Sequence, residues 1–279
     1  MIKRLAKAAL NLSLVFLFAL LIYYYLVLPF VLPSLIYGPI KEQTKSTLNV
    51  QDIYLNTSDN VKINVWYVKS KNNKPTILFC HGNGGNISSY EDIVEIFASK
   101  GYGVLLLDYR GYGKSEGTPS EIGLYKDINA ALKFLRGKEK LSNNQIILWG
   151  LSLGGAVVTE VASKENFKAV MLQSTFTNIK EEGIYMYGRL AKDKFSKTLI
   201  KAFFDNLIYL QKYDTESKIA KISSPLLIAH DIPDEVIPVK MSYELAKMNP
   251  KAKLFISKTG SHNDGTWFYE EALKFLEDK

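Results

Sequence analysis

The sequence predicts an α/β protein in which helices cover both faces of a mostly parallel sheet. Short apolar runs of strand length alternate with longer segments of helical periodicity along most of the 279 residues. Continuous apolar runs are typical of parallel strands that are buried on both faces. A hairpin pattern precedes them, and a hairpin followed by repeated strand–helix units predicts this class of sheet.

The expected elements can be placed in order along the chain. Leu48–Leu55 and Val61–Val68 alternate in hydrophobicity around turn residues, which predicts an antiparallel hairpin. The buried strands are expected at Thr76–Cys80, Val104–Leu107, Gln145–Trp149, Ala169–Leu172, Leu226–Ala229 and Leu254–Ile256. The helices are expected at Ser88–Lys100, Glu121–Leu135, Leu153–Ser163, Val239–Met248 and Thr266–Leu276.

One long stretch interrupts this alternation. Residues 176–222, called the cap segment below, contain no strand pattern and are rich in aromatic residues. An insertion of this length in a compact domain is usually functional or carries helices of its own. Ligands of open parallel sheets bind beyond the carboxyl ends of the strands. We therefore expect a helical cap that roofs a pocket at that edge.

The first 40 residues form a separate part. No charged residue occurs from Ala8 to Ile40, and about 20 apolar residues suffice for a helix to cross a bilayer. A buried core helix of this uniformity would be unusual, and a cleaved signal peptide would need a small-residue cleavage site after a shorter apolar run. Tyrosines at 23–25 suit the end of a membrane span. We expect residues 1–40 to be an uncleaved single-pass anchor.

The flanking charges give the expected orientation. Lys3, Arg4 and Lys7 precede the apolar run, and no acidic residue precedes Glu42. A basic flank tends to stay in the cytoplasm. Residues 41–279 are therefore expected to form one domain on the extracytoplasmic side, with the lipid bilayer as a partner through the N-terminal helix.

Composition excludes several classes of protein. A chain with 47% hydrophobic and 23% charged residues is not of the disordered type. The single cysteine, Cys80, excludes an intrachain disulfide and a cysteine-rich zinc site. The net charge of +7 could indicate nucleic acid, but three of the 35 basic residues and none of the 28 acidic ones precede residue 41. The rest is only slightly basic, so we expect no nucleic-acid partner.

A serine lies at a junction between an expected strand and an expected helix. Gly150-Leu151-Ser152-Leu153-Gly154 has the G-x-S-x-G pattern in strand–turn–helix context, which is typical of a nucleophile. The glycines fit because a tight turn brings other backbone close to them. The alternative is a structural turn. In the functional interpretation Ser152 is the nucleophile, and the N-terminus of the following helix can stabilise negative charge.

A glycine-rich bend follows the strand Thr76–Cys80. His81-Gly82-Asn83-Gly84-Gly85-Asn86 could direct backbone N–H groups at an oxyanion, or it could hold a phosphate. It matches neither common phosphate-binding pattern, so we expect an oxyanion hole formed by the N–H groups of Asn83 and Leu153. His81 is interpreted as structural.

A nucleophilic serine needs a base, and the chain has three histidines. His230 ends an expected strand and is interpreted as a hydrogen-bonded residue there. His262 lies in a loop after the last expected strand, where a base could reach Ser152. The orienting acid should follow an intermediate strand. The loop after Leu226–Ala229 offers Asp231, Asp234 and Glu235, of which any two are expected to be solvated.

Four stretches together carry a family resemblance. They are His81–Ile87, Asp108-Tyr109-Arg110-Gly111-Tyr112-Gly113-Lys114-Ser115-Glu116-Gly117, Trp149–Ala156 and Gly260-Ser261-His262-Asn263-Asp264. With them the chain resembles the α/β-hydrolase superfamily, and more closely the membrane-anchored α/β-hydrolase-domain proteins related to protein depalmitoylases. The resemblance spans residues 45–279 and implies an α/β-hydrolase fold. Its acid loop, His-Gly-x-x-Asp, implies that Asp234 is the acid, and Asp231 stands where glycine is usual.

The resemblance implies a serine hydrolase with a Ser152–His262–Asp234 triad that needs no metal or organic cofactor. With the anchor and the aromatic cap, we expect an acyl ester or thioester as substrate, in a lipid or a lipidated protein. The alternatives are a serine peptidase that uses Glu181 or Glu182 to bind a free amine, an acyl transferase, and a non-catalytic binding protein. In the hydrolase interpretation both glutamates are solvated.

Overall fold

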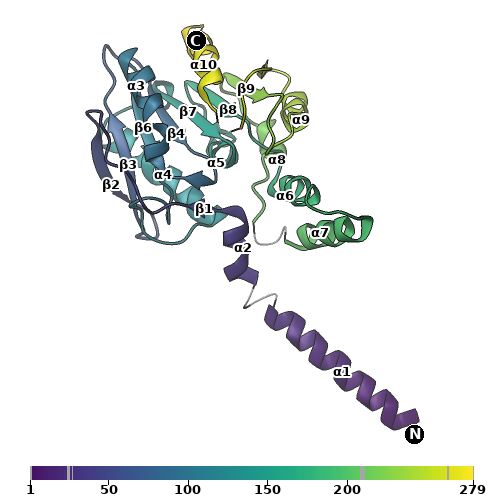
Figure 1. The fold of residues 1–279 in the computed structure, drawn as a ribbon. Helices are drawn as coiled ribbons and strands as arrows, with labels where there is room; N and C mark the ends of the chain where they lie inside the picture. Colours follow the sequence, from purple (N-terminus) through teal and green to yellow (C-terminus); the bar gives the residue numbers. More distant parts are fainter. Residues whose placement is uncertain (1, 24–25, 27, 208–210, 263, 279) are drawn as a thin grey trace. The chain divides into compact units, whose positions relative to one another are not determined.

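The chain divides into two compact units, residues 1–38 and 39–279, close to the boundary expected after residue 40. The computed structural model describes residues 2–23, 26, 28–207, 211–262 and 264–278 (Figure 1). Tyr24 and Tyr25 of the expected membrane span and Asn263 of the histidine loop lie outside these residues.

The N-terminal unit contains two helices, α1 (Ile2–Ile22) and α2 (Leu28–Ile36). The large apolar side chains of α1 are exposed at most of the positions from Leu10 to Ile22. Pro33 lies inside α2. In the part of the chain that the structure describes, no helix combines the length and the apolarity needed to cross a membrane.

The second unit is built on one eight-stranded sheet with the strand order β10-β9-β8-β7-β4-β6-β3-β2. Its strands are β2 (Gln51–Asn56), β3 (Lys62–Val68), β4 (Thr76–Cys80), β6 (Gly103–Leu107), β7 (Ile146–Leu151), β8 (Ala169–Gln173), β9 (Leu226–Asp231) and β10 (Lys253–Ser257). The strands from β10 to β6 pair in parallel, and β3 pairs antiparallel with both β6 and β2, so β3 alone runs against the other strands of this sheet. The predicted hairpin and mostly parallel sheet are confirmed.

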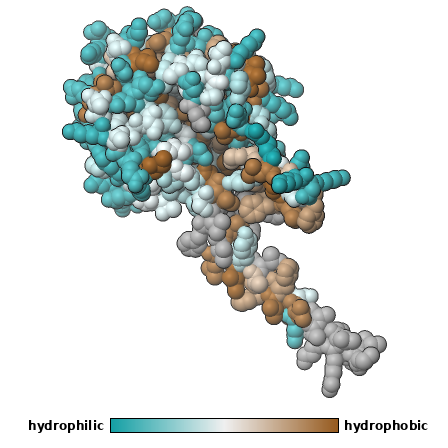
Figure 2. Space-filling model, in the orientation of Figure 1, coloured by the Kyte–Doolittle hydropathy of each residue, from teal (hydrophilic) through white to brown (hydrophobic). Residues whose placement is uncertain are grey.

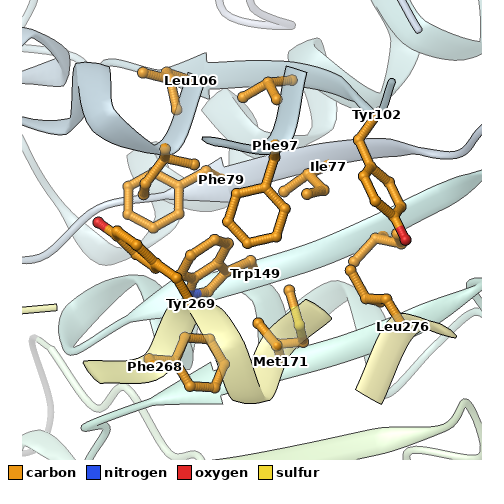
Figure 3. Close-up of a cluster of buried hydrophobic side chains, with 14 of the residues drawn as sticks. Ile77, Phe79, Phe97, Tyr102, Leu106, Trp149, Met171, Phe268, Tyr269 and Leu276 are labelled. Atoms are coloured by element: carbon orange, nitrogen blue, oxygen red, sulfur yellow. The ribbon is translucent and has the colours of Figure 1, made fainter. Parts of the chain in front are cut away.

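Helices cover both faces of this sheet (Figure 1). On one face α3 and α10 pack on a core in which Trp149 lies edge-on to Phe79 and Phe97, with ring centroids 5.1 and 5.3 Å apart (Figure 3). The alternate strand residues, such as Leu78 and Leu148, are also fully buried, because α4 and α5 cover the second face. The helices are α3 (Glu91–Ser99), α4 (Glu121–Gly137), α5 (Leu153–Ala162), α9 (Lys240–Met248) and α10 (Tyr269–Glu277).

The parallel strands bring four predicted site segments to one edge of the sheet. The loops after β4, β7, β9 and β10 all leave the carboxyl ends of strands, and these ends lie at the same edge. They carry Asn83, Ser152, Asp234 and His262 respectively. Short two-residue strands β1 (Gly38–Pro39) and β5 (Gly84–Gly85) pair separately from the main sheet.

The cap segment is helical, as expected. It contains α6 (Ile179–Gly188), α7 (Lys194–Leu207) and the short α8 (Glu216–Ile219). Asn178 caps α6 by accepting a hydrogen bond from the N–H of Glu181 at 2.8 Å. Glu181 is exposed, but the expectation that Glu182 is solvated is wrong. Its side chain is only 4% exposed, because it lies on the inward face of α6.

The buried carboxyl group of Glu182 has an unusual acidity. Neither of its oxygens has a hydrogen-bond partner among the described residues. Burial, reinforced by the negative charge of Asp234, raises the pKa of Glu182 from 4.5 to about 8. The folded chain therefore holds a proton near neutral pH that the unfolded chain releases, so its stability falls as pH rises between these two values.

Replacing Glu182 should change how stability depends on pH. Glu182→Gln stays neutral, so its melting temperature should match the wild type near pH 4.5 and exceed it by roughly 10 °C near pH 8. The expectation follows from about 1.4 kcal/mol per pKa unit and about 2–4 °C per kcal/mol in a domain of this size. Thermal unfolding at the two pH values would measure it. Glu181→Gln, a change at the exposed neighbouring residue, serves as the control. An equal difference in melting temperature between Glu182→Gln and the wild type at both pH values would contradict the prediction.

Candidate active site

Ser152 occupies a strained turn between β7 and α5. Its backbone has φ 54° and ψ −117°, a conformation that residues other than glycine rarely adopt. The surrounding backbone fixes it, because the Ser152 N–H donates to the Gln173 carbonyl at 2.9 Å and its carbonyl accepts from Thr175 Oγ1 at 2.8 Å. Strain that is held in this way is characteristic of functional sites.

The two glycines of the motif are needed for close approach, as the sequence predicted. A Cβ atom on Gly154 would overlap the carbonyl oxygen of Cys80, at the end of β4. A Cβ atom on Gly150 would overlap the backbone of Gly154. Any larger residue at either position would push α5 away from the sheet and move Ser152 with it.

The glycine-rich bend lies against the serine. A Cβ atom on Gly82 would be 3.5 Å from Ser152 Cβ, so the bend and the turn are in contact. The Gly82 carbonyl lies 2.7 Å from His81 Nδ1, which fixes the Gly82–Asn83 peptide whose N–H is the predicted donor. Leu153, the other predicted donor, is the first residue of α5, where N–H groups have no partner within the helix.

The motif that begins at Asp108 supports this bend, a role that the sequence did not indicate. Tyr109 Oη donates to the His81 carbonyl at 3.0 Å, and Tyr112 Oη donates to the Asn83 carbonyl at 2.7 Å. Asp108 accepts a hydrogen bond from the N–H of Ile87 at 2.8 Å. Both ends of the bend are therefore held by one neighbouring loop.

Arg110 holds that loop to two other elements. Its guanidinium bonds Asp127 on α4 and Asp59 in the β2–β3 turn, with the shortest N–O distance 2.9 Å in each case. These contacts hold the pKa of Asp59 well below its usual range, mainly through the hydrogen bond from Arg110. Gly113, with φ 45°, leaves room for the Asp108 carboxylate, which a Cβ atom there would overlap.

Asp234 and His262 form a close pair. His262 Nδ1 lies 2.7 Å from Asp234 Oδ2, and Asp234 Oδ1 accepts from the N–H groups of Val236 and Ile237 at 2.9 and 2.8 Å. Burial alone would raise the pKa of Asp234, but the hydrogen bonds from His230 and His262 hold it well below its usual range. The carboxylate is therefore an acceptor, which places the proton on His262 Nδ1 and leaves Nε2 to accept one.

His230 is a second histidine on the same carboxylate. Its Nε2 lies 2.9 Å from the Ile237 carbonyl and 3.2 Å from Asp234 Oδ2, while Nδ1 lies 2.6 Å from Ser242 Oγ. Both neighbours of Nε2 are acceptors, so Nε2 carries the proton and Nδ1 accepts from Ser242. The predicted hydrogen-bonded role is confirmed. Its contact with Asp234 was missed, although the four-residue spacing between the two was available as a signal.

Asp231, the reserve candidate for the acid, lies elsewhere. It ends β9, is fully buried, and has no partner for either carboxylate oxygen among the described residues. The expectation that two of the three loop acids are solvated is wrong, since only Glu235 is exposed. Asp231 also does not need the backbone freedom of the glycine usual there, because its φ is not positive. The structure pairs His262 with Asp234.

Ser152, Asn83 and His262 line one pocket of about 350 Å³. Its apolar wall comes from Phe79, Tyr90, Ile93, Leu151 and Tyr269. The expected roof from the cap segment is wrong for this pocket, because none of its described lining residues lies in 176–222. Among the described residues no hydrogen bond joins Ser152 to His262, as is common before substrate binds. No group of three potential metal ligands is found in the described part of the chain.

Comparisons with known proteins agree with this architecture. A family model described as alpha/beta hydrolase fold matches residues 75–204. The chain is 34% identical over 257 residues to alpha/beta hydrolase domain-containing protein WAV2 of Arabidopsis thaliana, covering 84% of this chain and 81% of the relative. It is 32% identical over 222 residues to YNL320W of Saccharomyces cerevisiae, named a membrane protein, covering 77% and 74%.

The solved structures show the same fold. Esterase Pf2001 of Pyrococcus furiosus superposes with a TM-score of 0.71 at 21% identity, over 87% of this chain and 98% of the esterase. The sheet, the turn at Ser152 and the relative from Arabidopsis lead to one conclusion. The chain belongs to the α/β-hydrolase family.

Proposed function

We propose that the chain is a serine hydrolase that cleaves an acyl ester or thioester through an acyl-enzyme on Ser152. The observation that carries this proposal is the shared pocket, in which a strained serine meets a histidine already bonded to a buried carboxylate. These are the parts that nucleophilic acyl transfer needs: a nucleophile, a base, and a group that orients the base.

In the proposed reaction, Ser152 Oγ attacks the acyl carbonyl while His262 Nε2 takes its proton. Asp234 keeps the proton of the imidazole on Nδ1 and stabilises the imidazolium. The N–H groups of Asn83 and Leu153 bind the oxyanion. His262 then returns the proton to the leaving alcohol or thiol as that bond breaks. Water attacks the acyl-enzyme by the same route and releases the acid and free Ser152.

One side of the pocket supports an apolar acyl group, although polar residues outnumber apolar ones in the lining. Tyr90 provides partly exposed aromatic surface beside Ser152, and Phe79, Ile93 and Tyr269 are buried behind it. Because these residues come from β4, α10 and the segment Ile87–Ser99, the acyl group would lie against the core of the domain rather than under the cap. A volume of about 350 Å³ suits the acyl end of a lipid or lipidated protein better than a whole lipid.

We also propose that residues 1–40 anchor the chain in a lipid bilayer, with the second unit on the extracytoplasmic side. The absence of charge from Ala8 to Ile40 supports this, as does the exposure of apolar side chains on α1. Lys3, Arg4 and Lys7 before the run support the orientation. The yeast relative is likewise named a membrane protein.

The nucleophile can be tested by covalent labelling. A fluorophosphonate probe should label the wild-type chain and should not label Ser152→Ala, because the reaction requires the activated Oγ. Hydrolysis of p-nitrophenyl esters and of acyl thioesters of increasing chain length would then define the acyl preference. A wild-type chain that resists the probe, or that cleaves aminoacyl amides but no ester or thioester, would contradict the proposal.

The acid can be tested with a matched pair of variants. Asp234→Asn should lower kcat by about 10⁴-fold, because the amide cannot hold the imidazole in the required tautomer. Asp231→Asn removes a buried carboxylate from the same loop and should leave kcat within a few-fold of the wild type. Melting temperatures of both variants would control for folding. The reverse order of effects would assign the acid to Asp231.

The anchor can be tested by partitioning. The full-length chain should enter the detergent phase of a phase-separation assay. A shortened chain that begins at residue 42 should stay in the aqueous phase and still react with the fluorophosphonate probe, because residues 39–279 form their own compact unit. Full-length chain in the aqueous phase would refute the anchor without affecting the catalytic proposal.

A further inference from the structure

Helix α7 of the cap segment has two apolar faces. On the inner face, Phe204 packs against α6, where it contacts Gly183 and lies 5.5 Å from the ring of Tyr187. On the outer face, Phe195 and Leu199 are four residues apart and therefore lie side by side on the helix. They are 72% and 54% exposed. The inner face accounts for the packing of α7, and the outer face has no such role in the described unit.

Basic residues occur along the same helix. Lys192, Lys194, Lys197 and Lys201 are all exposed along α7 and the turn before it. Lys194 is next to Phe195, whereas Lys197 and Lys201, each two residues from Leu199, lie on the other side of the helix. Of the two acids nearby, Asp193 accepts from the N–H of Ser196 at 2.8 Å, and Asp205 bonds Lys180 and Lys201, each at 2.7 Å. Both acids make local contacts. Because the four lysines outnumber these two acids, α7 and the turn before it have a net positive charge. Hydrophobic and hydrophilic side chains occur together in this region in Figure 2.

We propose that α7 binds the surface of a lipid bilayer that contains anionic headgroups. Phe195 and Leu199 would enter the boundary between headgroups and acyl chains, and Lys192 and Lys194, near Phe195 at the start of the helix, would contact the phosphates and carboxylates of the headgroups. Exposed apolar residues on a lysine-rich helix are the composition that interfacial helices use. The proposal requires neither the catalytic activity nor the N-terminal anchor.

Other occupants fit this surface less well. A second copy of the chain would bring the same lysines together and would be repelled. A bound peptide helix needs a groove, and the hollow of about 880 Å³ beside α6 is lined from α6 and α9 and by no described residue of α7. A flat anionic surface is complementary to both the charge and the outward position of Phe195 and Leu199.

The test places a reporter on the outer face of the full-length chain. A cysteine at Thr198→Cys leaves Phe195 and Leu199 in place, and the native Cys80 is fully buried. Ile122→Cys on α4, a position that is 64% exposed, serves as the control site. Each chain carries a fluorophore and is bound to phosphatidylcholine vesicles with or without phosphatidylserine, both doped with nitroxide-labelled lipid.

The label at 198 should be quenched several-fold more than the label at 122 when phosphatidylserine is present. The difference should shrink in high salt and in Lys192→Gln/Lys194→Gln, because both weaken the electrostatic attraction. Lys100→Gln/Lys133→Gln makes the same charge change elsewhere and should not reduce it. Fluorophosphonate labelling of Ser152 should be unchanged throughout, which separates this proposal from the catalytic one.

Two results would overturn the proposal. Equal quenching at 198 and 122 on phosphatidylserine vesicles, including no quenching at either site, would show that α7 does not contact lipid. A label at 198 that responds to protein concentration but not to vesicles would assign the face to a second copy of the chain.

Discussion

The close approach of α5 to the carboxyl ends of β4 and β7 is the constraint on which the active site depends. Gly154 lies so near the Cys80 carbonyl that no side chain fits between them. The chain must then turn within one residue, and Ser152 takes the strained φ of 54°. The turn thereby raises the serine above the sheet edge and aims the N-terminus of α5 at it. The core around Trp149 and the two covered faces of the sheet hold this geometry against the strain.

A second constraint is electrostatic. Asp234 is almost fully buried, and burial opposes its charge. Two histidines and two backbone N–H groups outweigh that cost, so the carboxylate remains ionised and fixes the tautomers of both rings. Glu182 shows the opposite case. Its carboxyl oxygens have no hydrogen-bond partner among the described residues, and burial together with the nearby charge of Asp234 keeps it protonated near neutral pH. Since both acids are buried, their opposite pKa shifts follow from the hydrogen-bond donors that surround each carboxyl group.

The sequence predicted those features that local pattern determines. The strands from β4 to β10 and the turn at Ser152 follow from apolar runs and glycine spacing, and the family resemblance pointed to Asp234. Burial of single polar side chains was not predictable, because it depends on which elements pack together. Glu182 and Asp231 both look like surface acids in the sequence, yet the packing of α6 and the end of β9 bury them. The support of the bend by Tyr109 and Tyr112 was missed for the same reason.

The pocket wall is formed outside the cap segment, although the sequence predicted that the cap segment would roof the pocket. The apolar side of the pocket is formed by residues of the sheet and of the helices on its core face, which are fixed by the packing around Trp149. No described residue of the cap segment lines it, and the aromatic residues of α7 have other surroundings. Phe204 joins α7 to α6, whereas Phe195 and Leu199 are exposed on the other side of this lysine-rich helix. In the proposed hydrolase, the core would then set the preference for the acyl group, and α7 of the cap would set the membrane surface that the domain contacts.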